Sequence, residues 1–157
     1  MTKIIKNNKK QIMRKVLMAA LLIVTVAASA FAKGEKVNYV AVGTFNAEFK
    51  NASNVQWTTT ENFVKATFIF NGEKMEAFYH PNGDKIGICR AVPIETLPTK
   101  AKNAFTTKYD GYTVKEIVEF DGEEEYAHYI FAENEKESVT VKVNSVNEIS
   151  LYKRTKK

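Results

Sequence analysis

The sequence predicts an α+β protein in which a short helix followed by four antiparallel strands occurs twice and builds one continuous sheet. Each half begins with an aromatic pair at i, i+4 spacing, either Phe45/Phe49 or Phe105/Tyr109. The strand-like segment Ala-Thr-Phe-Ile-Phe of the first half matches Ala-His-Tyr-Ile-Phe of the second almost position by position. Duplication of a supersecondary unit is typical of one extended sheet rather than of a catalytic scaffold.

The first 32 residues have the three-part layout of a secretory signal peptide. Residues 1–15 contain six Lys or Arg and no acidic residue, residues 16–28 are almost entirely apolar, and Ala30 and Ala32 place small side chains before the expected cleavage site. A transmembrane anchor is the alternative, but the apolar run is shorter than the roughly 20 residues that span a bilayer. We therefore expect cleavage after Ala32, no stable membrane anchor, and a periplasmic or secreted protein of residues 33–157.

Removal of this segment changes the charge of the chain. The full sequence has 23 basic and 18 acidic residues, and six basic residues leave with the signal, so 17 basic residues remain against 18 acidic ones. The high isoelectric point therefore belongs to the targeting segment. A nearly neutral exported part gives no reason to expect nucleic acid or an anionic membrane as a partner.

The first repeat covers residues 40–90. Val42, Phe45 and Phe49 stand at helical spacing and predict a short helix. Asn71-Gly72 and Asn82-Gly83 are two-residue hairpin signals, because Asn and Gly tolerate positive φ. The four strands of this repeat are expected at 55–57, 62–70, 74–80 and 85–90.

The second repeat covers residues 97–153 and follows a linker at 91–96. Pro98 stands where a helix favours its first residue, and apolar residues follow at helical spacing until Asp110-Gly111 ends the helix. The acidic residues 123–125 are interpreted as a solvated turn rather than a cation site. The four strands are expected at 113–120, 125–132, 138–143 and 148–153.

Alternation within the strands assigns two faces to the sheet. One set is apolar and is expected beneath the two helices: Val55, Trp57, Val64, Ala66, Phe68, Phe70, Met75, Ala77, Tyr79, Ala127, Tyr129, Phe131, Val139, Val141 and Val143. The opposite face mixes apolar and charged residues, which is more than a solvated sheet face needs and indicates a binding surface. Its predicted partner-binding residues are Phe63, Lys65, Ile69, Glu76, Phe78, His80, Tyr126, His128 and Ile130.

Catalytic chemistry has little support in this sequence. The two histidines, His80 and His128, have no spacing typical of a metal site or a triad, and no Gly-rich phosphate loop occurs. Cys89 is the only cysteine, so we expect a buried thiol and no internal disulfide. The face assignment places Cys89 and His80 on opposite faces, which opposes their use as nucleophile and base. We therefore predict no catalytic residues, no metal and no cofactor.

Several of these motifs also occur together in a known family. In the first half they are Phe45-x-x-x-Phe49, Asn54-Val55-Gln56-Trp57, Asn71-Gly72, Ala77-Phe78-Tyr79 and Asn82-Gly83. In the second half they are Leu97-Pro98, Phe105, Tyr109, Gly111-Tyr112 and Tyr126. The chain resembles the exported PepSY-like proteins, also described as β-lactamase-inhibitor-like (BLIP-like) proteins, over nearly all of residues 33–157.

The resemblance implies a single domain with one curved antiparallel sheet and the helices on its convex side. It also implies non-enzymatic binding, with inhibition of a hydrolase or restraint of a peptidase as the specific roles. No contact residue of the family has a recognisable motif here, and the cysteine pairs of disulfide-braced inhibitors are missing. The resemblance therefore assigns no site residue.

Two functions follow from these observations. The leading one is an exported protein-binding module that docks a partner, such as a hydrolase or peptidase, on the open face of the sheet, with Phe63, Phe78 and Tyr126 as anchors. The alternative is a carrier of a small apolar ligand in the periplasm. A pocket lined by Phe63, Ile69, Phe78 and Ile130 would favour the carrier.

Overall fold

The computed structural model describes residues 37–157, which form two compact units, 37–87 and 88–157. Their boundary falls within strand β4 (Lys85–Ala91), and each unit is described by itself. The strands are hydrogen-bonded in chain order from β1 to β8, and two α-helices accompany them, so the predicted α+β class is confirmed. The predicted signal peptide, residues 1–32, lies outside the described residues.

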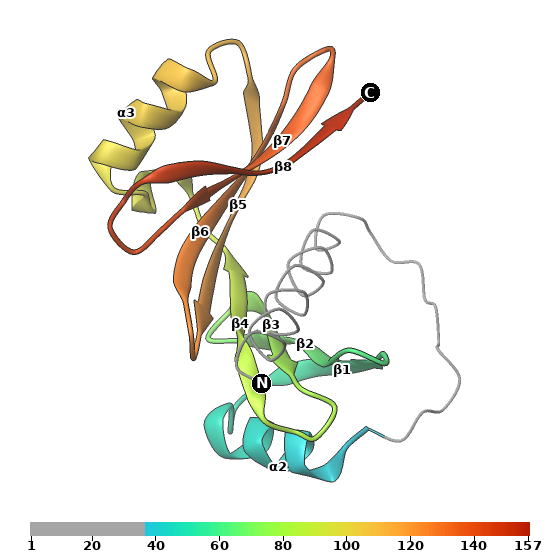
Figure 1. Cartoon of the computed structure of the whole chain (residues 1–157). Helices are drawn as coiled ribbons and strands as arrows, with labels where there is room; N and C mark the ends of the chain where they lie inside the picture. Colours follow the sequence, from blue (N-terminus) through green and yellow to red (C-terminus); the bar gives the residue numbers. More distant parts are fainter. Residues whose placement is uncertain (1–36) are drawn as a thin grey trace, which may run out of the picture. The chain divides into compact units, whose positions relative to one another are not determined.

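The first unit contains one helix and the strands that follow it (Figure 1). Its elements are α2 (Tyr39–Glu48), β1 (Ser53–Thr59), β2 (Val64–Phe70), β3 (Glu73–Tyr79) and the first residues of β4. β1 pairs with β2 and β2 with β3, both antiparallel. The helix and strands therefore occur where the sequence predicts them, with ends shifted by a few residues.

Aromatic side chains attach α2 to this sheet. The ring of Phe45 lies 4.8 Å from that of Phe68 and 5.3 Å from that of Trp57, and the ring of Phe49 lies 4.6 Å from that of Phe68. The Asn38 side chain accepts a hydrogen bond from the Val40 amide at 2.8 Å and so caps the start of the helix. Trp57, Phe68 and Phe70 of the predicted apolar face therefore lie against the helix.

The two predicted hairpin turns differ in the structure. Asn71 and Gly72 both have positive φ (52° and 83°), as a tight two-residue turn requires. The second turn is longer, because the His80 amide donates to the Asp84 carbonyl and the Gly83 amide donates to the His80 carbonyl. Only Gly83 is left-handed there, with φ 100°. A Cβ at that glycine would lie 2.5 Å from the Cβ of Val40, so the turn packs directly on the start of α2.

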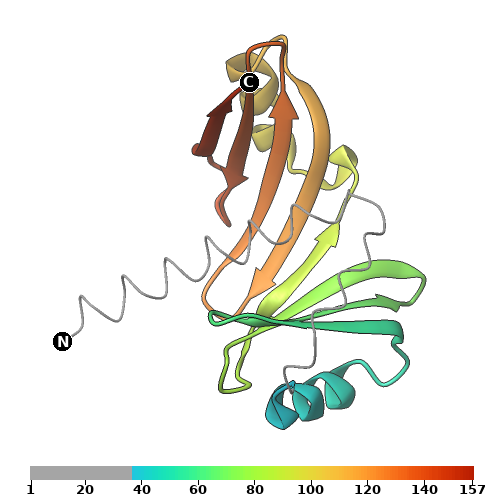
Figure 2. The ribbon, with the colours of Figure 1, turned by 90° about the vertical axis from the view of Figure 1, so that its right-hand side faces the viewer.

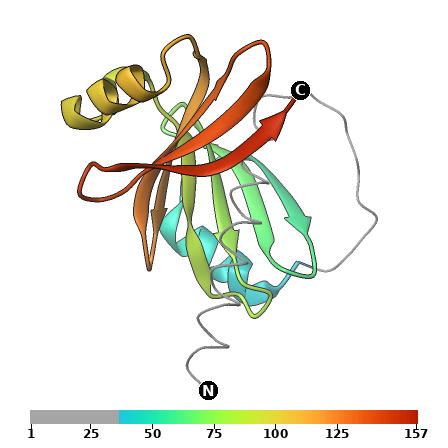
Figure 3. The same ribbon diagram turned by 45° about the horizontal axis from the view of Figure 1, so that its top comes forward.

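The second unit contains the end of β4, a short 3-10 helix, one α-helix and four strands (Figure 2). Its elements are η2 (Ile94–Thr96), α3 (Thr99–Lys108), β5 (Thr113–Gly122), β6 (Tyr126–Glu133), β7 (Glu137–Val143) and β8 (Ile149–Lys156). β5 and β6 are the longest pair, and α3 lies beside this four-stranded sheet (Figure 3).

β8 extends to Lys156, three residues beyond the expected strand end. Arg154 pairs with Val139 in the register and its Nε lies 3.4 Å from the Glu137 carboxylate. Lys157 Nζ lies 2.9 Å from the Glu133 carboxylate. The basic C-terminal segment is therefore part of the sheet up to Lys156, and acidic residues of β6 and β7 form ion pairs with it.

The face assignment of β6 was wrong. Ile130 is paired with Val141 and belongs to the core beneath α3, whereas Tyr129 is paired with Lys142 on the other face. The predicted apolar set Ala127, Tyr129 and Phe131 therefore faces away from α3. Residues 127–132 are buried without interruption, so polarity does not alternate along this strand, and the sequence lacks the signal that separates the two faces.

The same register affects the matched segments. Ala66 and Phe68 belong to the face that carries the α2 contacts, but their sequence counterparts Ala127 and Tyr129 lie on the face opposite α3. The similarity of the two five-residue segments is therefore not a similarity of structural position. In β1, a register shift between Ser53 and Gln56 leaves Val55 36% exposed, so it is not part of the core.

Candidate functional site

The structure places the nine predicted binding residues in quite different surroundings. Six lie in the first unit: Phe63, Glu76 and Phe78 are buried, and Lys65, Ile69 and His80 are half-buried. Three lie in the second unit: His128 and Ile130 are buried, and Tyr126 is 45% exposed. The expectation of one open face shared by all nine is therefore corrected. A role in binding stays a prediction for the residues that a partner can reach.

In the first unit, four of these residues form a buried polar and aromatic cluster. Lys65 Nζ donates to Glu76 Oε1 at 2.9 Å, and Thr67 Oγ1 donates to the same oxygen at 3.3 Å. The rings of Phe63 and Phe78 meet edge to face at 5.7 Å. Cross-strand pairing of Lys65 with Phe78 and of Thr67 with Glu76 brings these side chains together.

Burial raises the pKa of Glu76, and the nearby Lys65 opposes this only in part. The second carboxylate oxygen, Oε2, is buried without a hydrogen-bond partner in the described part of the chain. Burial of a charged carboxylate is costly even though Lys65 pairs with one of its two oxygens. The cluster therefore belongs mainly to the interior, and a partner has little access to it.

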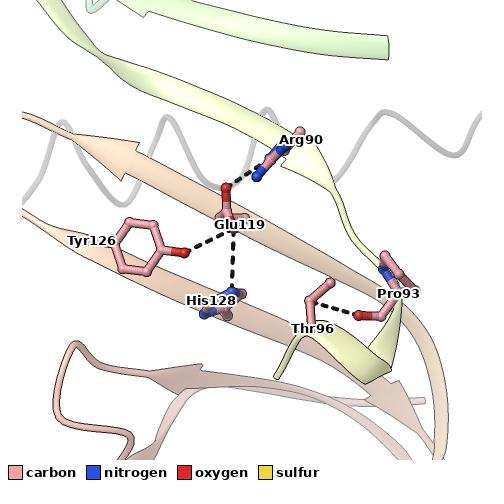
Figure 4. Close-up of polar contacts among 6 residues, drawn as sticks. All are labelled: Arg90, Pro93, Thr96, Glu119, Tyr126 and His128. Atoms are coloured by element: carbon pink, nitrogen blue, oxygen red, sulfur yellow. Dashed lines mark hydrogen bonds and ion pairs between the residues drawn. The ribbon is translucent and has the colours of Figure 1, made fainter. Parts of the chain in front are cut away.

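In the second unit, Tyr126 and His128 join two residues that the sequence analysis missed, Arg90 and Glu119 (Figure 4). Arg90 Nε donates to Glu119 Oε1 at 2.8 Å, and the Tyr126 hydroxyl donates to Glu119 Oε2 at 2.9 Å. His128 Nε2 lies 3.6 Å from the same Oε2. We call Arg90, Glu119, Tyr126 and His128 the Tyr126 patch.

Strand pairing explains why these side chains meet. Glu119 is paired with His128 and Asp121 with Tyr126 across the β5–β6 hairpin, and Arg90 comes from β4. The rings of Tyr126 and His128 meet edge to face at 5.4 Å. Glu119 between Val118 and Phe120 follows the ordinary alternation of a strand, so the local sequence does not single it out.

The patch is electrostatically organised around Glu119. Burial alone would raise its pKa, but the hydrogen bonds from Arg90 and Tyr126 and the charge of Arg90 outweigh burial and hold the pKa below its usual value. Burial lowers the pKa of His128, and Arg90 adds to this effect while Glu119 opposes it. At neutral pH the patch therefore contains an ionised carboxylate and an uncharged imidazole.

The exposed part of the patch is amphipathic. Tyr126 is 45% exposed and the Arg90 side chain is 42% exposed, while the Glu119 and His128 side chains are 13% and 8% exposed. Burial of Tyr126 and its bond to Glu119 raise the pKa of its hydroxyl, which stays protonated and able to donate. The Tyr126 ring and the Arg90 guanidinium are thus exposed side by side, and hydrogen bonds to Glu119 hold both in place.

The described residues offer no arrangement of three or more His, Cys, Asp or Glu side chains that could hold a metal ion. Cys89 is buried. Within residues 37–157, none of the helices has the length and apolar character needed to cross a membrane.

Ile130, one of the four residues whose pocket would favour an apolar carrier, belongs to the core beneath α3. The second unit has an open depression of about 570 Å³ on its surface. Its lining is polar: Gly111, Thr113, Lys115, Glu133, Asn134, Glu135, Lys136 and Lys157. Such a lining does not suit an apolar ligand.

Comparisons with known proteins support the fold alone. No family model matches the chain, and no curated protein matches it. Among solved structures, a BLIP-like protein from Bacteroides fragilis NCTC 9343 superposes with a TM-score of 0.65 at 16% identity, covering 79% of this chain and 89% of that one. A DUF2874 family protein from Bacteroides ovatus ATCC 8483 gives 0.67 at 16% identity, covering 78% and 89%.

A third structure, named as a candidate periplasmic protein of Bacteroides eggerthii DSM 20697, gives a TM-score of 0.67 at 13% identity, covering 78% of this chain and 90% of that one. The chain thus shares the fold of DUF2874 and BLIP-like proteins. At these identities the likeness identifies neither a partner nor a site residue.

Proposed function

We propose that the chain is an exported, non-enzymatic protein-binding module and that the Tyr126 patch contacts its partner. The observation that carries the proposal is the fixation of an exposed aromatic ring. Tyr126 is 45% exposed, yet its hydroxyl is held by Glu119, which Arg90 holds in turn.

The chemistry of the patch suits protein recognition. Tyr and Arg are the residues most often found at energetic centres of interfaces, where a ring and a guanidinium bury large areas at little entropic cost. The Glu119 network restricts Tyr126 before binding, so less conformational entropy is lost when a partner covers it. The proposal retains Tyr126 and His128 from the predicted set and adds Arg90 and Glu119.

The half-buried Ile69 and His80 of the first unit are proposed as separate, secondary contacts. Lys65 is proposed to support this surface from the buried cluster, because its side chain is 13% exposed and paired with Glu76. Phe63, Glu76, Phe78 and Ile130 are assigned to the interior instead, because each is at most 7% exposed. Substitution of these four would change stability before it changed binding. His128 is equally buried, and it is retained as a neighbour that supports Tyr126 rather than as a residue that the partner touches.

We further propose that the partner is an exported hydrolase or peptidase. The support is the fold shared with a protein named BLIP-like and the sequence resemblance to PepSY-like and BLIP-like proteins.

We also propose that the chain belongs to this exported family and that cleavage occurs after Ala32. Its two halves are proposed to have arisen as a tandem repeat of a helix and four strands. The order of helix and strands in each half supports the repeat.

The test is capture of partners from the exported fraction of the host with the purified protein as bait. We expect a stoichiometric hydrolase or peptidase, whose activity falls when the protein is added. Capture should be lost with Tyr126→Ala and kept with Tyr39→Ala, a matched variant at a tyrosine that is 86% exposed outside the patch. Equal capture by the wild type and Tyr126→Ala, with both folded, would contradict the proposed site.

A further inference from the structure

The Tyr126 patch contains a group that can change its charge near neutral pH. His128 is buried, and its Nε2 lies 3.6 Å from Glu119 Oε2, the oxygen that accepts the Tyr126 hydroxyl at 2.9 Å. At 3.6 Å an uncharged imidazole makes no hydrogen bond with the carboxylate. Glu119 Oε2 therefore has two potential donors, the Tyr126 hydroxyl and His128 Nε2, and only the hydroxyl makes a hydrogen bond to it.

We propose that the patch is a pH-sensitive contact surface in which protonation of His128 draws its imidazolium to Glu119 Oε2 and weakens the hold of Glu119 on the exposed Tyr126 side chain. A charge-assisted N–H···O⁻ bond is about 2.7–2.9 Å long and roughly twice as strong as a neutral one. The contact at 3.6 Å must therefore shorten when His128 gains a proton.

The other carboxylate oxygen limits how Glu119 can respond. Oε1 is held by Arg90 Nε at 2.8 Å, so the carboxylate cannot turn freely toward His128. The imidazole must approach instead, and the Tyr126 ring, packed against it at 5.4 Å, is displaced with it. Sharing of the carboxylate charge between Arg90 and an imidazolium also reduces its strength as an acceptor for the Tyr126 hydroxyl.

The groups around His128 determine the pH at which its imidazole gains a proton. The charged groups that act on it are Glu119 on β5, which favours protonation, and Arg90 on β4, which opposes it. Tyr126 is the titratable neighbour on its own strand, and its partner on β7 is the apolar Val143. Because burial lowers the pKa of His128 from its usual value of 6.5, the imidazole is uncharged at neutral pH and gains its proton only at a lower pH.

Thermodynamic reciprocity gives the inference a sharp test. If protonation of His128 weakens the Tyr126–Glu119 hydrogen bond, that bond must in turn disfavour protonation. Removal of the hydroxyl in Tyr126→Phe should therefore raise the pKa of His128. Tyr112→Phe removes a hydroxyl that donates to Glu137 elsewhere in the same unit, and it should leave the pKa of His128 unchanged.

The experiment is an NMR titration of the exported protein, following the His128 Cε1–H and the Tyr126 ring signals from pH 8 to pH 5. A His80→Gln variant identifies which imidazole signal belongs to which of the two histidines. We expect the Tyr126 signals to move with the midpoint of His128, to become independent of pH in His128→Gln, and the midpoint to rise in Tyr126→Phe. The inference would be overturned if the Tyr126 signals did not change at the titration midpoint of His128. It would also be overturned if that midpoint were unchanged or lower in Tyr126→Phe.

The consequence for binding rests on the proposed function, but the titration needs no partner. Partner affinity should fall as the pH drops through the His128 midpoint, and it should not do so in His128→Gln. Failure of the titration with intact binding at Tyr126 would reject only the pH-sensitive contact. Success of the titration without any partner at the patch would reject only the binding function.

Discussion

Glu119 is the residue on which the geometry of the Tyr126 patch depends, because it joins Arg90 on one oxygen to Tyr126 on the other. Sequence analysis identified Tyr126 and His128 from their aromatic and polar character. It could not identify Glu119 and Arg90, because their roles arise from pairing across β4, β5 and β6 rather than from local pattern.

Glu119→Gln tests this residue directly, because it keeps the shape of the side chain and removes its charge. Hydrogen bonds to a charged group are worth about 1.5–3 kcal/mol, so we expect the free energy of unfolding to fall by about 2 kcal/mol at pH 7. Denaturant unfolding measures the change. Glu123→Gln on the adjoining exposed turn is the control, and an equal effect of both variants would show that Glu119 has no special role.

Glu76 predicts a pH dependence of the opposite kind to that of Glu119. Burial raises its pKa above 4.5, so the folded state binds a proton that the unfolded state has already released. The stability of the wild type relative to Glu76→Gln should therefore decrease as the pH rises from 4.5 through the folded-state pKa. Unfolding of both proteins across pH 4–8 measures this difference, and a difference that grows with pH would contradict the account of Glu76.

At the scale of elements, the turns were the most predictable part of the fold, because Asn and Gly have a direct conformational reason to occur there. Asn71-Gly72 forms the expected tight turn, whereas the turn at Asn82-Gly83 is longer, because the His80 amide donates to the Asp84 carbonyl and the Gly83 amide to the His80 carbonyl. Strand positions followed from alternation. The faces of β6 did not, since both sides of that strand are buried.

Gly83→Ala should destabilise the first unit, because φ is 100° and the new Cβ would lie 2.5 Å from that of Val40. We expect a loss of about 1–3 kcal/mol from strain of this kind. Gly43→Ala, in the middle of α2 with open space around it, should instead stabilise by about 0.5–1 kcal/mol. Thermal unfolding of the pair measures both effects, and similar melting temperatures would refute the packing of the turn on α2.

Ile130→Ala should act on stability rather than on binding, because the side chain is fully buried beneath α3. Loss of a buried Ile side chain costs about 2–5 kcal/mol. Ile94→Ala, at a residue that is 37% exposed, should change stability by about 0.5 kcal/mol or less. A well-folded Ile130→Ala variant with unchanged stability would restore the original assignment of this residue to an open face.

At the scale of the whole molecule, the α+β class and the antiparallel strand order could be predicted, because each depends on local periodicity and turns. The candidate site could be predicted only in part. Of the nine predicted residues, Phe63, Phe78 and Ile130 have the large apolar side chains that interfaces use, but they are buried in the interior. Apolar side chains satisfy a core and an interface equally well, and sequence alone does not distinguish the two.

The central claim is that the exposed ring of Tyr126, supported by Glu119 and Arg90, supplies binding energy for a protein partner. The most direct measurement is the dissociation constant of the captured partner for the wild type, Tyr126→Ala and Tyr39→Ala, together with their melting temperatures. Central interface residues cost about 2 kcal/mol or more on truncation, so we expect affinity to fall about 30-fold or more for Tyr126→Ala and to stay unchanged for Tyr39→Ala. Equal affinities for all three proteins, at equal melting temperatures, would contradict the claim.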